Sequence, residues 1–290
     1  MINVLSLFDG MSCGQIALER AGIAVDKYFA SEIKEHAMKI TKEHYPSTIF
    51  IGDVRQISYA DGILTTSNGS FSVKIDLLMG GSPCQNFSCL NSYQAKENYG
   101  LKGEQSSLFF EYLRLLKEIK PTYFLLENVR MKKESEAELN TYLGVKGVHI
   151  NSNLVSAQNR HRIYWSNIAF DMPIDKNIAL STVLENDAIH LDAARVTKTP
   201  SRDKMFYGGK CKNITRETKA SCLTTKQDRW NNAGLLEYKD YCRFLTPIEC
   251  ERLQTVPDNY TAGISTAKRY DLLGDGWTVD VIAHILSYIR

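Results

Sequence analysis

The chain has 290 residues, and none of its seven cysteines lies in an arrangement typical of a metal site or a disulfide framework. No two of them form a Cys-x-x-Cys pair, no histidine lies near them at metal-ligand spacing, and their number is odd. These absences argue against a structural zinc site and against a disulfide-stabilised secreted fold. The sequence also contains no internal repeat and no low-complexity tract.

Long hydrophobic runs are equally scarce. No apolar segment reaches membrane-spanning length, and residues Met1–Leu7 lack the basic region and cleavage site of a signal peptide. We therefore expect a protein that stays in the cytoplasm and makes no membrane contact. A hydrophobic content of 43% with 23% charged residues is ordinary for a globular protein and does not indicate disorder.

The net charge of +2 is unevenly distributed along the chain. The segment Arg195–Arg229 contains ten Lys or Arg against three Asp or Glu, which is a net charge of +7. A basic segment within a nearly neutral protein is a candidate contact for a polyanion. A solvated surface explains the same charge equally well.

Short apolar runs alternate with helical patterns over the first 168 residues. This alternation predicts an α/β protein with a mostly parallel sheet covered by helices. The predicted strands lie at 4–8, 28–32, 49–51, 75–79, 123–126 and 162–165, and the predicted helices at 14–21, 35–44 and 107–119. The periodicity weakens after about residue 170, and a helix with Thr246 as N-cap and Pro247 in its first turn marks the return of order.

Several polar or small residues follow directly after predicted strands, where doubly wound sheets bind ligands. The first strand runs into Phe8–Gly14, whose small residues allow a ligand to approach the backbone, although the incomplete G-x-G-x-x-G pattern disfavours a dinucleotide. Glu32 ends the second strand and could accept hydrogen bonds from a ribose diol. Asp53 follows the third and could meet an adenine edge. Taken alone, either acid is better explained as a helix cap or a surface residue.

Cys84 follows a predicted buried strand and the turn Gly80–Pro83. Taken alone, this cysteine is most simply a small buried hydrophobe. Glu127 ends a neighbouring predicted strand, and we expect the segment Gln158–Arg162, with its arginines Arg160 and Arg162, to lie nearby in the fold. A thiolate, a proton donor and fixed cations in one cleft suit attack on an electron-poor ring whose nitrogen is protonated as the nucleophile adds.

A series of motifs, in the same order along nearly the entire chain, resembles those of the cytosine-C5 DNA methyltransferases, which use S-adenosylmethionine. Only the basic segment from about 170 to 240 is unmatched in detail. Within the family, the closest branches are the small bacterial and phage enzymes and the catalytic domains of the mammalian de novo enzymes. The motifs are the cofactor loop Phe8–Gly14, the nucleophile loop Gly80–Gln85, the Glu-Asn-Val sequence Glu127–Val129, the Gln-x-Arg-x-Arg motif Gln158–Arg162 and the C-terminal cofactor motif Leu273–Val279.

The resemblance implies the Rossmann-like fold of S-adenosylmethionine-dependent methyltransferases, with helices on both faces of a mixed, mostly parallel sheet. We expect residues 1–168 to form the catalytic and cofactor-binding domain. Residues 169–240 are then a small, irregular target-recognition region. Residues 241–290 are expected to return as helices to the catalytic domain.

The resemblance also implies a mechanism for transferring a methyl group to a flipped-out cytosine in duplex DNA. The Cys84 thiolate, in a loop with Pro83, would add to C6 of the base. Glu127 would bond N3 and the exocyclic amine, and Arg162 would hold O2. Arg160 would support the thiolate or a phosphate.

A site for S-adenosylmethionine, without a metal, is implied by the same motifs. Phe8 would pack on the adenine, Glu32 would hold the ribose hydroxyls and Asp53 would contact the adenine amine. Asp275 stands where the family commonly has asparagine, and we expect this substitution to be neutral. The implied cofactor-binding residues are Phe8, Asp9, Gly10, Cys13, Gly14, Glu32, Ile33, Asp53, Val54, Gly81, Leu108, Asp275, Gly276, Trp277 and Thr278.

Double-stranded DNA is the implied partner, and Thr224–Arg229 is the best candidate for a loop that approaches its bases. A solvated linker explains this segment equally well. The implied DNA contacts are Gln85, Ser88, Gln158, Thr224, Thr225, Lys226 and Arg229.

Two other functions stay open. The first is an RNA cytosine-C5 methyltransferase, although the Cys-Phe-Thr signature of the tRNA-methylating branch is absent. The second is a catalytically silent regulator, although Cys84, Glu127 and Arg162 are all present. Because no endonuclease domain fits in 290 residues, we expect a separate restriction endonuclease to supply any such activity.

Overall fold

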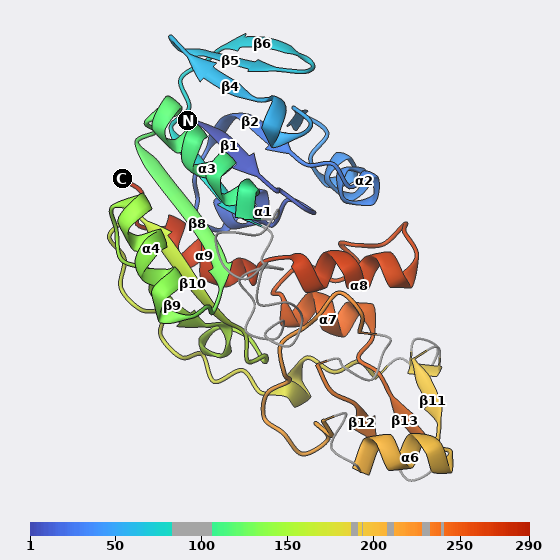
Figure 1. Cartoon of the computed structure of the whole chain (residues 1–290). Coiled ribbons are helices and arrows are strands. Elements are labelled where there is room, and N and C mark those ends of the chain that lie inside the picture. Colours follow the sequence, from blue (N-terminus) through green and yellow to red (C-terminus); the bar gives the residue numbers. More distant parts are fainter. Residues whose placement is uncertain (83–105, 187–190, 193, 208–211, 228–232, 239–240) are drawn as a thin grey trace. The chain divides into compact units, whose positions relative to one another are not determined.

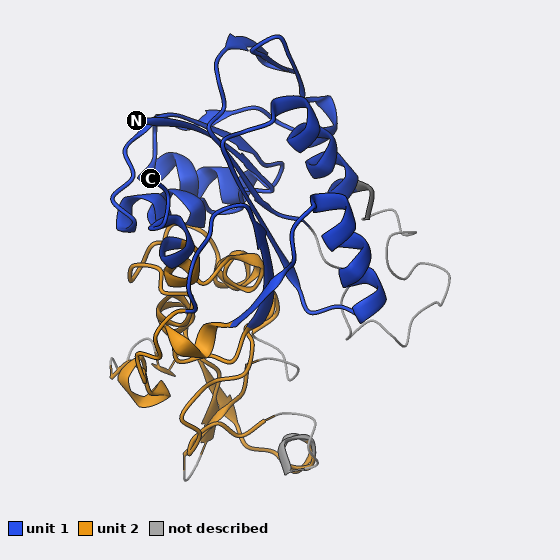
Figure 2. Cartoon of the chain, turned by 90° about the vertical axis from the view of Figure 1, so that its left-hand side faces the viewer, with its two compact units in different colours: residues 1–150, 161–172, 283–290 blue, residues 151–160, 173–282 orange. Residues whose placement is uncertain are grey.

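The structure is a computed structural model, and it describes residues 1–290 except for 83–105, 187–190, 193, 208–211, 228–232 and 239–240 (Figure 1). The described chain forms two compact units that interleave along the sequence (Figure 2). Unit 1 contains residues 1–150, 161–172 and 283–290, and unit 2 contains residues 151–160 and 173–282. The three domains predicted from the sequence are each continuous, whereas each unit of the structure combines segments that are separated along the chain. The functional roles given to the three predicted domains stay predictions.

Unit 1 is built on a seven-stranded sheet with the strand order β3-β2-β1-β7-β8-β10-β9. The strands from β3 to β8 in this order run parallel, and β10 is antiparallel to β8. Because the chain leaves β1 first toward β2 and later toward β7, the loop after β1 lies at the topological switch point. The strands are β1 (Ile2–Leu7), β2 (Val25–Ser31), β3 (Ile49–Phe50), β7 (Leu77–Gly81), β8 (Tyr123–Val129), β9 (Val148–Asn151) and β10 (His161–Ser166).

Helices cover both faces of this sheet. Leu78 of β7 shares a buried core cluster with Phe109 and Leu113 of α3. The next residue, Met79, points to the opposite face, where a Cβ added to Gly14 of α1 would lie 2.4 Å from its Cε. Unit 1 contains the helices α1 (Cys13–Arg20), α2 (Glu35–His44), α3 (Ser106–Ile119) and α4 (Lys133–Leu143).

A small antiparallel sheet is inserted between β3 and β7, and the apolar periodicity did not predict it. Its strands are β4 (Ser58–Ala60), β5 (Ile63–Thr66) and β6 (Gly69–Ser72), in the order β4-β5-β6. Asp61 and Gly62 have φ of 50° and 77°, which is the left-handed pair required by a tight hairpin turn. This Asp-Gly dipeptide was the local signal for the hairpin. The helix α4 and the strand β9 were also not predicted.

Unit 2 combines a small antiparallel sheet with helices. The predicted N-cap at Thr246 is confirmed, since Thr246 and Glu249 form a reciprocal capping box at the start of α7. Behind this cap, Arg243 and Glu249 form a fully buried ion pair with 2.7 Å between Nη1 and Oε2. The elements are η4 (Ser152–Leu154), η5 (Leu180–Thr182), β11 (Arg195–Thr197), α6 (Pro200–Tyr207), β12 (Leu236–Glu237), β13 (Tyr241–Arg243), α7 (Pro247–Leu253) and α8 (Thr266–Asp275), followed by α9 (Val279–Leu286), which runs on into unit 1.

Two kinds of feature are absent from the described residues. None of their helices combines the length and the apolar character needed to cross a bilayer. Among the same residues, no three His, Cys, Asp or Glu side chains are grouped so that they could hold a metal ion.

Candidate active site

The loop after β1 has an unusual backbone conformation at the topological switch point. Phe8, Gly10 and Ser12 all have positive φ, between 57° and 59°. A Cβ added at Gly10 would meet no atom within 4 Å, so open space lies beside the backbone there. A left-handed backbone costs energy at the non-glycine positions, and such strain is concentrated at functional sites.

Asp9 turns its carboxylate into this loop, where it is buried. Its Oδ1 accepts a hydrogen bond from the Tyr28 hydroxyl over 2.6 Å, and its Oδ2 accepts one from the Ser12 hydroxyl. Burial raises the pKa of Asp9 to about 6, the nearby charge of Glu32 adds to this rise, and the two hydroxyls oppose it. Asp9 therefore fixes the loop from inside. The following residues, Cys13 and Gly14, begin α1 and are also buried.

Glu32, at the end of β2, holds two backbone segments together. Its Oε2 accepts the Gly10 N–H over 2.7 Å. Its Oε1 accepts the N–H groups of Ile33 and Lys34 at 2.7 and 2.8 Å. The side chain of Ile33 is 66% exposed, which leaves an apolar surface beside an ordered carboxylate. The structure thus brings Phe8, Gly10, Glu32 and Ile33 into one part of unit 1.

Asp53 lies just after β3 and caps the short helix η1 (Val54–Gln56). Its Oδ1 accepts the Arg55 N–H over 3.0 Å, and its Oδ2 lies 2.5 Å from Arg55 Nη2. This guanidinium lowers the pKa of Asp53. The helix-cap interpretation of this acid therefore holds, and any ligand contact shares the carboxylate with Arg55. Val54 is buried beneath it.

Glu127 and Arg162 form an ion pair at the carboxyl end of β8, with 2.9 Å between Glu127 Oε1 and Arg162 Nε. The sheet register explains this contact. Glu127 pairs with Tyr164 and Arg162 pairs with Val129 on the antiparallel strands β8 and β10, so the two charged residues are diagonal neighbours on one face. Both side chains are largely buried, at 10% and 14% exposure.

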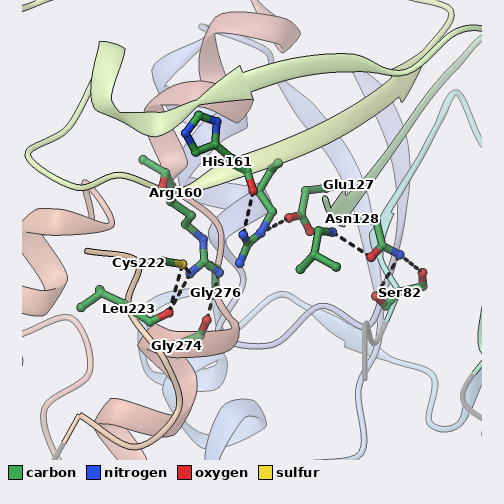
Figure 3. Close-up of polar contacts among 12 residues, drawn as sticks. Ser82, Glu127, Asn128, Arg160, His161, Cys222, Leu223, Gly274 and Gly276 are labelled. Atoms are coloured by element: carbon green, nitrogen blue, oxygen red, sulfur yellow. Dashed lines mark hydrogen bonds and ion pairs between the residues drawn. The ribbon is translucent and has the colours of Figure 1, made fainter. Parts of the chain in front are cut away.

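The strand that leads to the predicted nucleophile lies beside this ion pair. Gly81 of β7 pairs with Glu127 of β8 in the parallel register. One residue further along each strand, Asn128 Nδ2 donates to Ser82 Oγ over 2.9 Å, and both residues are buried (Figure 3). Ser82 is the last described residue before Pro83. Leu108 of α3 is partly buried against the unit 1 core. The predicted residues Pro83, Cys84, Gln85 and Ser88 lie outside the described residues.

In unit 2, Arg160 of the Gln-x-Arg-x-Arg motif binds backbone carbonyls. Its Nη2 donates to the carbonyl oxygens of Gly274 and Gly276, each over 2.9 Å (Figure 3). Its Nη1 donates to the Leu223 carbonyl over 3.2 Å and to Cys222 Sγ over 3.4 Å. The residue is 2% exposed, so its guanidinium is used within the unit.

Gln158 is likewise fully buried, although the motif predicted a DNA contact. Its Nε2 donates to the Leu253 carbonyl and to Gln254 Oε1, and its Oε1 accepts the Leu223 N–H over 3.3 Å. Gln254 in turn accepts a hydrogen bond from the hydroxyl of Thr278 over 2.9 Å. Gln254 was not predicted from the sequence, because an isolated glutamine within a helical pattern carries no signal of such a role.

The Thr224–Gln227 loop packs directly against the end of α8. A Cβ added to Gly274 would lie 2.3 Å from Thr224 C and from Thr225 N, so only glycine fits this contact. Gln227 Nε2 also closes the loop on the Thr224 carbonyl over 2.8 Å. Asp275 and Lys226 are exposed, and Trp277 and Thr278 are buried. Arg229 lies outside the described residues.

Comparison with known proteins identifies relatives over the whole chain. Residues 2–203 and 191–290 match the family described as C-5 cytosine-specific DNA methylase. The Type II methyltransferase M.NlaX of Neisseria lactamica is 26% identical over 324 residues, which cover 100% of this chain and 96% of that protein. The Type II methyltransferase M.Bsp6I of Bacillus sp. (strain RFL6) is 26% identical over 328 residues, which cover 100% and 98%.

Solved structures share the fold. The Entamoeba histolytica methyltransferase EhMeth superposes with a TM-score of 0.78 at 18% identity, covering 99% of this chain and 97% of that one. The Dnmt2 methyltransferase of S. pombe gives a TM-score of 0.72 at 17% identity, with the same coverage. These similarities confirm the predicted Rossmann-like α/β class.

Proposed function

Because the chain belongs to the C-5 cytosine-specific DNA methylase family, we propose that it transfers a methyl group from S-adenosylmethionine to C5 of a flipped-out cytosine in duplex DNA, through a covalent bond between Cys84 and C6. The observation that supports this most strongly is the Glu127–Arg162 ion pair. It lies at the end of β8, in register with the last residue of the strand that leads into Pro83 and Cys84.

The chemistry assigns one role to each of these residues. The Cys84 thiolate forms a bond to C6, and the electron pair of the C5–C6 double bond makes C5 nucleophilic. Glu127 bonds N3 and the exocyclic amine, so negative charge on the ring is neutralised as it develops. Arg162 holds O2 and orients Glu127. After methylation a base takes the proton from C5, the bond from sulfur to C6 breaks, and the thiolate returns.

The residues of unit 1 fit a nucleoside-bearing cofactor. Glu32 accepts three backbone N–H groups, and a carboxylate offers about four acceptor positions, so capacity remains for a ribose hydroxyl. The exposed Ile33 and the half-buried Phe8 provide apolar surface for the adenine. S-adenosylmethionine supplies the methyl group when bound. Asp53 accepts a hydrogen bond from the adenine amine in addition to those that it accepts from Arg55.

The other predicted cofactor residues act through the backbone or through packing. The loop after β1 is fixed by Asp9, Cys13 and Gly14. The other proposed cofactor residues of unit 1 are Val54, Gly81 and Leu108. The proposal also includes the cofactor residues that the family motif implies in unit 2, which are Gly276, Trp277 and Thr278, with Asp275 as a neutral replacement of asparagine. All of these cofactor contacts are part of the proposed function.

Duplex DNA is the proposed partner, with Lys226 as the described residue best suited to a phosphate because its ammonium group lies on an exposed side chain. Thr224 and Thr225 belong to the same loop, and Gln85, Ser88 and Arg229 extend the contact. We also propose that the enzyme acts in the cytoplasm of a prokaryotic cell. A separate restriction endonuclease would recognise the same DNA sequence.

Transfer of labelled methyl groups tests the proposal. The chain is incubated with methyl-labelled S-adenosylmethionine and either unmethylated genomic duplex DNA or tRNA, beside the Cys84→Ala variant. We expect label only in duplex DNA and only with the unaltered chain. Label confined to tRNA would identify the RNA methyltransferase instead, and label in neither substrate would favour the silent regulator.

The covalent bond is tested separately with DNA that contains 5-fluorocytosine. S-adenosylmethionine is included, and once C5 has been methylated the fluorine there cannot leave as a proton, so the bond between Cys84 and C6 should persist and give a protein–DNA species that survives denaturing electrophoresis. The Cys84→Ala variant should give none.

A further inference from the structure

The turn between β5 and β6 contacts the segment that carries Asp53. Asn68 Nδ2 donates to the carbonyl oxygen of Phe50 over 3.0 Å. Beside this bond, a Cβ added to Gly52 would lie 3.1 Å from the hydroxyl oxygen of Ser67. Gly52 has a φ of 76°, which glycine adopts without strain. The tip of the inserted sheet therefore lies directly on the residues that precede Asp53.

This contact matters because few strand–strand hydrogen bonds hold β3 in place. It contains only Ile49 and Phe50 and pairs with β2 through these two residues at the edge of the sheet. Beyond it, the Ile51 N–H donates to the Ala30 carbonyl, and the Ser31 hydroxyl donates to the Gly52 carbonyl over 2.8 Å. The contact from the hairpin adds a support from outside the main sheet.

The hairpin is itself held firmly. Leu64 of β5 is fully buried in the unit 1 core, and Phe71 of β6 packs edge-on against Phe29 of β2 with 5.2 Å between ring centroids. Within the turn, Thr66 Oγ1 accepts the Asn68 N–H over 3.1 Å and donates to the Gly69 carbonyl over 3.0 Å. The amide of Asn68 is thus presented by a turn that is already ordered.

We propose that Asn68 is a positioning residue for the cofactor, which fixes the Phe50–Gly52 segment so that Asp53 can meet the amine of the adenine. This inference rests on the proposed function, and specifically on the contact between Asp53 and the adenine. It assigns a purpose to the inserted sheet β4-β5-β6. Asn68 acts through the backbone and does not touch the cofactor.

The test is a double-mutant cycle in which the binding affinity is measured with two ligands. Calorimetry on the full chain measures the affinity for S-adenosylmethionine and for an analogue with purine in place of adenine, which lacks the 6-amino group. The variants are Asn68→Ala, Asp53→Ala and the double variant. Asn68→Asp is nearly isosteric but cannot donate to Phe50, so it should behave as Asn68→Ala does. Thr65→Ala, in the same hairpin, is the matched control.

We expect Asn68→Ala to weaken binding of S-adenosylmethionine about fivefold, which is the size of effect typical of one lost hydrogen bond. The double variant should bind no more weakly than Asp53→Ala alone, and binding of the analogue should be unaffected by Asn68→Ala. Activity at saturating cofactor should also be unchanged. Thr65→Ala should bind both ligands normally.

Equal weakening for both ligands, or no weakening for either, would overturn the inference, because neither result depends on the adenine amine. If Asp53→Ala binds S-adenosylmethionine normally, the role of Asp53 fails and the inference with it. If the unaltered chain does not bind S-adenosylmethionine, the proposed function itself fails. The three results are distinguishable.

Discussion

Asn128 donates its side-chain amide to the hydroxyl oxygen of Ser82 over 2.9 Å and so ties the residue after Glu127 to the residue before Pro83. Both partners are buried, so water does not compete for the bond. Asn128 Oδ1 also accepts the Val129 N–H over 2.8 Å, which fixes the orientation of the amide. The acid and the start of the nucleophile loop therefore share one support.

Replacing Asn128 with Ala should slow formation of the covalent bond. Loss of the amide leaves the buried Ser82 hydroxyl without this donor, which costs about 1–3 kcal/mol, and the start of the nucleophile loop loses its anchor. We expect roughly tenfold slower trapping by DNA that contains 5-fluorocytosine. Thr141→Ala, on the exposed surface of α4, is the control. Trapping at an unchanged rate would mean that the loop is positioned by other contacts.

Glu127→Gln should abolish most of the activity while preserving the fold. The amide oxygen can still accept from Arg162 Nε, so the contact at the end of β8 persists. The variant loses the carboxyl group that, on the proposed mechanism, exchanges a proton with the base, an effect worth roughly 100-fold or more in rate. Single-turnover methyl transfer measures it, with thermal unfolding as the check on stability. A rate near that of the unaltered chain would remove Glu127 from the proposed proton transfer.

Two substitutions separate two roles for Arg160. In Arg160→Lys, the lysine cannot reach the carbonyls of Leu223, Gly274 and Gly276 together, so we expect a loss of stability of about 3 kcal/mol. In Arg160→Ala, the salt dependence of DNA binding should not change, because the guanidinium is already used within unit 2. If Arg160 instead contacted a phosphate, Arg160→Ala would lower the slope of log affinity against log salt by about one.

Asp9→Asn should change how stability depends on pH. A carboxyl group with a raised pKa contributes stability that is complete below its unfolded value of 3.8 and is lost as the pH rises through about 6. The unaltered chain should therefore gain roughly 2 kcal/mol over Asp9→Asn as the pH falls from about 7.5 to about 4.5. Urea unfolding at several pH values measures the difference. Parallel curves for the two proteins would show that Asp9 does not titrate in this range.

The strand-end acids could be predicted from the sequence because their positions follow from local pattern. Glu32 and Glu127 each end an apolar run, and a parallel sheet brings the carboxyl ends of such runs to one edge. The Glu127–Arg162 contact is a further step. It depends on the antiparallel register of β10, which the sequence does not reveal.

Other parts of the site could not be predicted because their partners are distant and belong to the backbone. Arg160 binds carbonyls 63 and 114 residues away, and a carbonyl has no signature in the sequence. For the same reason Gln158 was expected to face DNA, although its amide holds unit 2 together. The inserted sheet β4-β5-β6 could not be predicted for another reason. Its strands are short and polar, so the Asp61-Gly62 turn between β4 and β5 is the main signal.

The contacts that hold the Thr224–Gln227 loop have a consequence for how this protein can diversify. Gly274 packs on the backbone atoms of Thr224 and Thr225, and Arg160 binds the carbonyl just before them. Because these supports ignore side-chain identity, mutations at Thr225 or Lys226 can change the side chains of this loop without removing the backbone contacts beneath them. On the proposed function, in which this loop approaches DNA, new sequence preferences can arise by single substitutions while Gly274 and Arg160 stay fixed.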